Sequence, residues 1–148
     1  MSKNFKIESK NLLAVEGKDE CNFFKALLKN SDINKTKIQI IDISGKNQFA
    51  DKFDALYIGE GFKRIKQLGF VRDAEEKPAQ SAFQSICGIL RKKKLPTPDK
   101  PNQVTEKQGL KIGVYIMPDN KEAGMLENLC LQTIKDKPIN DCIQNYIQ

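Results

Sequence analysis

The sequence has no histidine, and its 4 cysteines, spread over 148 residues, contain no Cys-x-x-Cys pair. Catalytic triads that depend on histidine are therefore excluded, and a structural zinc site is poorly supported. Cys87, Cys130 and Cys142 fall on apolar positions of helical patterns. We expect these cysteines to pack in the core of a protein that works in a reducing compartment.

Long apolar runs are also missing. None approaches the roughly 20 residues that a membrane-spanning helix requires, and the first residues lack the hydrophobic region of a signal peptide. The sequence thus predicts a cytoplasmic protein without a membrane partner. Its formal net charge of +6 is modest and spread along the chain, so it is compatible with a phosphate-rich partner without identifying one.

Apolar or β-branched runs alternate with helical patterns along most of the chain, which suits a single domain over residues 1–148. Strands are predicted at residues 12–15, 37–43, 68–72 and 111–117, and helices begin near residues 18, 49, 78 and 126. Repeated strand–helix units are typical of parallel strands joined by right-handed crossovers. We therefore expect an α/β, Rossmann-like fold with a four-stranded parallel sheet and helices on both faces. A last amphipathic pattern, at residues 139–147, is still running where the sequence ends, which suggests a longer natural chain.

Residues 92–109 form the longest stretch without a strand or helix pattern. Three prolines within six residues exclude a helix or a central strand there. A connection this long is usually functional or disordered, and we expect a mobile loop. The basic residues Lys92, Lys93 and Lys94 at its start allow a second interpretation, a contact with nucleic acid.

Acidic residues follow three of the four predicted strands. The carboxyl ends of parallel strands meet at one edge of a sheet, where ligands bind in open α/β folds. Carboxylates gathered there would repel one another without a counter-charge. A divalent cation removes that conflict, and a site made only of oxygen ligands indicates Mg²⁺ or Mn²⁺. The candidate ligands are Glu16, Glu20, Asp73, Glu75 and Asp119.

Two local patterns bear on how these acids are oriented. The apolar stripe of the first predicted helix would turn Glu20 inward, beside Glu16. Alternatively, Glu20 is there because acids favour the positive end of a helix dipole. Asp73 and Glu75 are one residue apart, so on an extended segment they would point to the same side. We expect Glu16, Asp73 and Glu75 to lie within bridging distance of one metal ion.

The strand-end motifs, taken in order, resemble those of the TOPRIM domain. DNA primases, type IA and type II topoisomerases, recombination-repair proteins and nucleases of the OLD (overcoming lysogenization defect) type share this domain. Val15-Glu16-Gly17, after an apolar strand, resembles the first TOPRIM motif. Asp73-Ala74-Glu75 resembles the D-x-D motif, with glutamate in place of the second aspartate.

The resemblance covers about residues 10–135. Glu16 with Glu20 is similar to the paired glutamates of the OLD-type branch, which is associated with a two-metal site. Met117-Pro118-Asp119-Asn120, followed by Gly124 and Leu126-Glu127, further resembles small stand-alone TOPRIM-like proteins of bacteria whose function is not established.

The resemblance implies a Mg²⁺- or Mn²⁺-dependent nuclease that acts on nucleic acid, on DNA rather than RNA. Glu16 would then serve as acid or base and as a metal ligand, while Lys18 or Arg72 would steady the charge that develops on the phosphate. No strand-passage or transesterification module accompanies these motifs, which disfavours topoisomerase action. Two other hypotheses stay open. One is a regulatory module that binds metal, nucleotide or a partner protein with little catalysis, and the other is a purely structural role.

Overall fold

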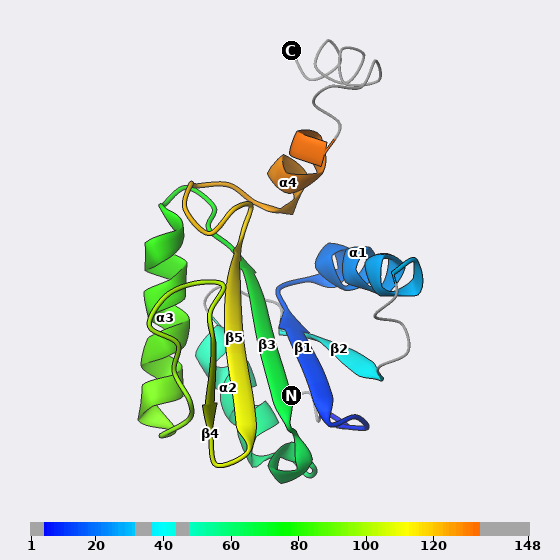
Figure 1. Cartoon of the computed structure of the whole chain (residues 1–148), viewed down its shortest axis with the longest axis vertical. Coiled ribbons are helices and arrows are strands. Elements are labelled where there is room, and N and C mark those ends of the chain that lie inside the picture. Colours follow the sequence, from blue (N-terminus) through cyan, green and yellow to red (C-terminus); the bar gives the residue numbers. More distant parts are fainter. Residues whose placement is uncertain (1–4, 32–36, 44–47, 134–148) are drawn as a thin grey trace.

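The computed structural model describes residues 5–31, 37–43 and 48–133, and they form a three-layer α/β arrangement (Figure 1). Five strands make one sheet in the order β2-β1-β3-β5-β4. In chain order the elements are β1 (Asn11–Val15), α1 (Lys18–Lys29), β2 (Ile38–Asp42), α2 (Phe49–Ile58), the 3-10 helix η2 (Phe62–Arg64), β3 (Gln67–Asp73), α3 (Ala79–Lys92), β4 (Val104–Lys107), β5 (Leu110–Met117) and α4 (Leu126–Thr133).

The four predicted strands are confirmed, and β2, β1, β3 and β5 pair in parallel. The sheet also has a fifth strand that the sequence did not predict. β4 pairs antiparallel with β5, so residues 104–107 of the expected loop are not structureless. A two-residue turn joins the two strands, with positive φ angles of 51° at Gln108 and 81° at Gly109, as tight hairpins require. Whether the rest of residues 92–109 is mobile stays a prediction.

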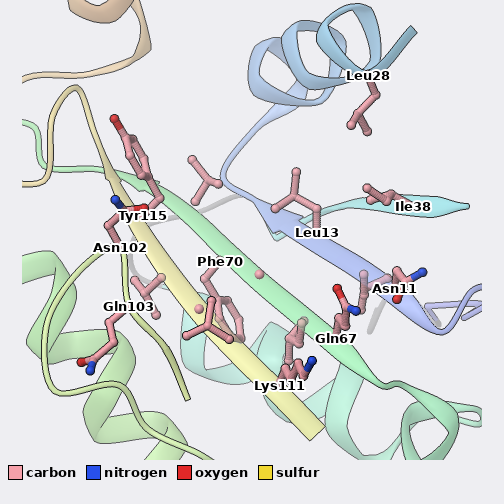
Figure 2. Close-up of a pocket in the computed structure, with 17 residues that line it drawn as sticks. Asn11, Leu13, Leu28, Ile38, Gln67, Phe70, Asn102, Gln103, Lys111 and Tyr115 are labelled. Carbon is pink, nitrogen blue, oxygen red and sulfur yellow. The ribbon is translucent and has the colours of Figure 1, made fainter. Parts of the chain in front are cut away.

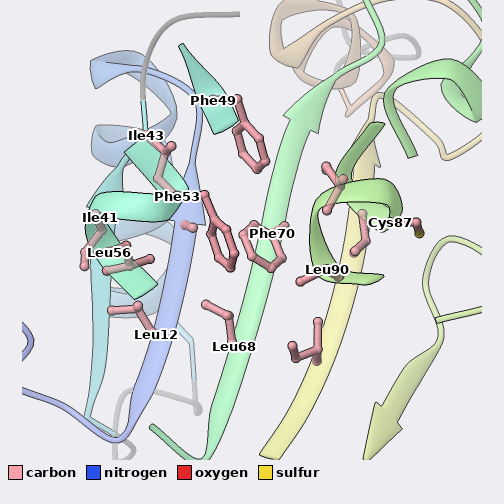
Figure 3. Packing of buried hydrophobic residues seen from close by; sticks show 14 of the residues in the cluster. Leu12, Ile41, Ile43, Phe49, Phe53, Leu56, Leu68, Phe70, Cys87 and Leu90 are labelled. Atoms are coloured by element: carbon pink, nitrogen blue, oxygen red, sulfur yellow. The ribbon is translucent and has the colours of Figure 1, made fainter. Parts of the chain in front are cut away.

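The main core lies between the sheet and the pair α2 and α3 (Figure 3). Alternation along the strands turns Leu12, Leu68 and Phe70 to this side, where Phe53 and Phe83 are completely buried. The phenyl rings of Phe53 and Phe70 lie 5.6 Å apart, centroid to centroid. These aromatic contacts hold α2 against β3 of the sheet.

The opposite face is covered by α1 and α4, whose apolar residues pack with Val15, Val71 and Met117 at the carboxyl ends of the strands. Further down the strands this face has a hollow of about 550 Å³, lined by residues such as Leu13, Leu28 and Tyr115 (Figure 2). Two paired glycines, Gly69 of β3 and Gly113 of β5, are among the residues that line it. None of the candidate metal ligands lines this hollow.

The cysteine prediction holds only in part. Cys87 is buried in the main core as expected, whereas Cys130 is exposed because it lies on the outer side of α4. Cys142 and the predicted amphipathic pattern at residues 139–147 lie outside the described residues. Among the helices that the structure describes, none is long and apolar enough to cross a membrane.

Two glycines allow a test of the hairpin. Replacing Gly109 with alanine should lower the free energy of unfolding by about 1 kcal/mol, because alanine at a φ of 81° is strained. Gly88 is the matched control: it lies within α3, and an added Cβ there would meet no neighbouring atom within 4 Å. Gly88→Ala should raise stability by roughly 0.5 to 1 kcal/mol. Urea unfolding measures both, and equal effects of the two substitutions would contradict the hairpin geometry.

Candidate functional site

The acidic edge is built on the register of β1 against β3. Val15 pairs with Val71, so Glu16 follows at the level of Arg72, and Asp73 is the next residue of β3. Alternation then sends Arg72 toward α2 and α3, and Asp73 toward α1 and α4. The side chains of Arg72 and Asp73 therefore lie on opposite faces of the sheet.

Arg72 fixes the position of Glu16. Its Nε lies 3.4 Å from the Glu16 Oε2, and both side chains are largely buried. The guanidinium also lies 5.3 Å from the centre of the Phe49 ring and donates a hydrogen bond of 3.4 Å to the Ser85 hydroxyl. These contacts hold the cation from two helices and the sheet at once. Arg72 is thus a positioning residue for Glu16, and its burial does not suit the direct phosphate contact predicted for it.

Glu20 is confirmed as an inward-facing residue of the first turn of α1, where only 8% of it is exposed. Gly17, with a φ of 114°, makes room for it: a Cβ at this glycine would lie 2.6 Å from the Glu20 Oε2. Burial raises the pKa of Glu20, and the nearby carboxylates of Glu127, Asp19 and Glu16 raise it further. A side chain that only complemented the helix dipole would have no need of this cradle.

Asp73 is the most perturbed acid at the edge. Burial is the main reason that its pKa rises from 3.8 to about 7, and the charge of Glu20 is the next. Glu16 and Glu127 add to the rise, while a hydrogen bond from the backbone N–H of Leu126, 3.0 Å from the Asp73 Oδ1, opposes it. The same hydrogen bond caps the start of α4. Protonation of Asp73 relieves the repulsion that crowding creates.

Two acids of this region were not predicted. Glu127, in the first turn of α4, acts on both Asp73 and Glu20 through its charge. Asp42, at the end of β2, accepts a hydrogen bond of 3.0 Å from the backbone N–H of Gly17 and so anchors the loop that carries Glu16. The position of Asp42 at a strand end was a usable signal. The signal for Glu127 was its place in the first turn of a helix predicted after the strand at residues 111–117, since that helix begins at the same edge of the sheet.

Glu75 does not lie on an extended segment, so the expected alternation with Asp73 is wrong. Its φ is 62°, in the left-handed region. The backbone of Glu75 instead forms a two-way bridge with Gly124, through N–O distances of 2.6 and 2.7 Å. This bridge ties the end of β3 to the loop before α4.

Asp119 has a local role in a turn. Its Oδ1 accepts hydrogen bonds from the backbone N–H groups of Lys121 and Glu122, at 3.0 and 2.9 Å. These bonds favour the charged form and lower the pKa of Asp119. Asp119 is not among the charges that shift Asp73 or Glu20.

Across residues 5–31, 37–43 and 48–133, no three acidic or cysteine side chains gather closely enough to hold one metal ion together. In the described residues, Glu16, Asp73 and Glu75 therefore do not form a preformed three-ligand site for one ion. What the fold does bring together is an electrostatic group of four carboxyl groups, from Glu16, Glu20, Asp73 and Glu127.

The basic candidates separate into two locations. Lys18 is the first residue of α1, exposed, and directly follows the Glu16-Gly17 corner. Lys92, Lys93 and Lys94 lie where α3 ends, at the opposite edge of the sheet, because α3 runs back along the strands (Figure 1). Lys93 pairs with Asp54, at 2.7 Å from its Oδ1. The length of α3, 14 residues or roughly 21 Å, separates this basic end from the acids.

Residues 10–148 match a known protein family, described as "Protein of unknown function (DUF3226)". The chain belongs to the DUF3226 family. The match of this DUF3226 chain includes the ends of all four parallel strands and every candidate metal ligand from Glu16 to Asp119. No curated protein and no solved structure matches the chain.

The raised pKa of Asp73 predicts how stability depends on pH. Between pH 3.8 and about 7, folded Asp73 keeps a proton that the unfolded chain has lost. Stability of the metal-free protein should therefore fall as pH rises through this interval. Glu20 contributes in the same direction. In Asp73→Asn, the melting temperature with EDTA should fall with pH about half as steeply as in the wild type. Asp119→Asn is a half-buried control, and because the pKa of Asp119 is lowered, its own titration lies below this interval. It should leave the slope unchanged, and a flattening by this control instead would contradict the assignment.

A second prediction concerns the buried ion pair. Arg72→Met should lower the free energy of unfolding by about 3 kcal/mol, because it leaves the Glu16 carboxylate in a largely apolar place without its cation. Adding Glu16→Gln should recover part of that loss. Urea unfolding of the two single variants and the double variant gives the coupling energy. Additive effects would mean that Arg72 does not act on Glu16.

Proposed function

We propose that this DUF3226 protein is a TOPRIM-like phosphodiester hydrolase that acts on nucleic acid with Mg²⁺ or Mn²⁺. The observation that carries the proposal is the gathering of Asp73, Glu20, Glu16 and Glu127 at one strand edge, where burial and, after it, the charges of the other three carboxyl groups raise the pKa of Asp73 to about 7. Crowded carboxyl groups with strongly raised pKa values are typical of functional sites. The motifs around Glu16 and Asp73 provide the second line of support.

The donor set fits a hard divalent ion. Mg²⁺ is usually bound by one or two protein carboxylates together with water and substrate phosphates, so a cage of three protein ligands is not required. Asp73 and Glu20 are the best pair to hold the ion, since Glu20 is the strongest charged influence on Asp73. When bound, such an ion would stabilise the negative charge that develops on the phosphate.

The roles of the other residues follow from their contacts. Glu16 is held by Arg72 in a fixed orientation, which suits a group that takes a proton from water or gives one to the leaving oxygen. Lys18 is exposed beside this corner and is free of the constraint that holds Arg72, so it is the better candidate to contact phosphate. Glu75 and Asp119 are weaker ligand candidates, because each takes part in a local backbone structure.

One observation favours a second candidate, a regulatory module that binds metal or nucleotide without much catalysis. Within the described part of the chain, the carboxylates do not form a ready three-ligand centre. A module of this kind would bind the ion through the same acids and would lack turnover.

Turnover and ion binding separate the two candidates. We expect the protein to cleave plasmid or single-stranded DNA with Mn²⁺ or Mg²⁺. Glu16→Gln and Asp73→Asn should each lower the rate by about 100-fold or more, as for the loss of an acid–base or electrostatic group. The same ions should raise the melting temperature of the wild type by several degrees, since an ion at 100 times its dissociation constant adds about 2.7 kcal/mol.

Asp119→Asn is the matched control for both measurements. It removes one carboxylate from the same edge, but from a turn, and should change neither the rate nor the ion-dependent melting shift by more than about 2-fold. A melting shift that Asp73→Asn abolishes, without any cleavage, would establish the regulatory module instead. If wild type and Asp73→Asn respond equally to the ions, Asp73 is not a ligand and the hydrolase proposal fails.

A further inference from the structure

A second concave site lies at the opposite edge of the sheet from the acids. It is a pocket of about 840 Å³, bounded by the turn between α2 and η2, the residues after α3, and the turn between β4 and β5. Three separate stretches of the chain meet there, near the lower edge of the sheet in Figure 1. The pocket shares no residue with the acidic edge.

The charge of this basic pocket is strongly one-sided. Its lining includes a single carboxylate, Glu60, among five exposed cationic residues. These are Lys63, Arg64, Lys66, Lys94 and Lys107.

None of the five cations forms an ion pair with another described residue, whereas other lysines of the chain do. Lys6 pairs with Glu8, Lys93 with Asp54, and Lys111 with Glu106. Cations brought together from distant parts of the chain repel one another, and the fold here supplies little to offset that repulsion. A polyanionic ligand would do so.

One wall of the pocket is apolar. Ile58 is 80% exposed, more than any other large hydrophobic residue in the described part of the chain. Beside it, the ring of Tyr57 is held edge to face by Phe62, at 5.1 Å between centroids, and by the Lys93 ammonium, 5.1 Å from the Tyr57 centroid. Leu95 and Pro96 continue this wall. A fixed aromatic ring next to exposed aliphatic surface suits a flat, partly apolar ring system.

We propose that the basic pocket binds a nucleoside polyphosphate, with the phosphates on the cations and the base against Tyr57 and Ile58. Its volume lies in the range of small-molecule sites, roughly 300 to 1,000 Å³. Sites that bind nucleic acid usually bury surfaces of about 1,000 Å² or more and track a backbone, so a pocket of this kind favours the free nucleotide. The basic run that begins at Lys92 thereby contributes through Lys94 to a ligand site and not to an extended nucleic-acid surface.

Calorimetric titration of the full chain with EDTA present tests this without any contribution from a bound ion. The probes are the four ribonucleoside triphosphates, inorganic tripolyphosphate, adenosine and a 12-nucleotide single-stranded DNA. We expect at least one nucleoside triphosphate to bind more tightly than tripolyphosphate, and adenosine to bind weakly. The double variant Lys66→Glu with Lys107→Glu should weaken nucleotide binding by about 10-fold or more.

The control is Lys25→Glu with Lys100→Glu, which makes the same change of net charge at exposed lysines outside the basic pocket. It should change nucleotide affinity by less than about 2-fold. Lys66→Gln with Lys107→Gln is the milder pair to use if the charge reversal lowers the melting temperature. Equal losses in pocket and control variants would overturn the proposal, as would no binding of any nucleotide. Tighter binding of the DNA than of every nucleotide, lost in the same pocket variants, would assign the pocket to nucleic acid and overturn it too.

Discussion

The parallel register between β1 and β3 is the constraint on which the acidic edge depends. Because Val15 lies opposite Val71, Glu16 comes level with Arg72, and the two form an ion pair beneath the edge. Asp73, one residue further, turns to the other face and meets α1 and α4. The register therefore brings the carboxyl groups within electrostatic range of one another while it keeps them on different faces of the sheet. The pKa of Asp73 is raised mainly by burial and then by these neighbouring charges, although no three described acids converge on one point.

Most of the fold could be predicted because the spacing of apolar residues along the sequence distinguishes its strands from its helices. The central strands are short apolar runs, and each is followed by a helix with one apolar stripe, which leaves little freedom in how they pack. The antiparallel strand β4 was not predicted, because the sequence signals for a strand and a hairpin turn are weak there. Its turn uses Gln108-Gly109 in place of the more usual Asn-Gly, Val104 is largely exposed, and prolines precede the strand. Its pairing depends on β5, a partner whose identity the local sequence does not contain.

The candidate site was predicted as far as strand ends alone allow. Glu16 and Asp73 could be placed at one edge because position in a parallel sheet determines where they lie, and the apolar stripe of the first helix placed Glu20 facing inward, while their role as metal ligands stays a prediction. Glu75 could not be placed correctly, since a left-handed φ at that residue depends on its bridge with Gly124, about fifty residues away. The burial of Arg72 could not be predicted for a similar reason, because it depends on the helices α2 and α3, which enclose its side chain.

The short outer strand β4 has a consequence for how the molecule behaves among copies of itself. An outer strand offers unsatisfied backbone groups to which another chain can add. Here that strand has only four residues, Val104–Lys107, and ends in a lysine. Asn102 still donates its N–H to the Val114 carbonyl of β5, but Pro101 before it has no N–H with which to continue a ladder in that direction. The short strand β4, which the sequence did not predict, thus limits pairing of this edge of the sheet with another copy of the chain.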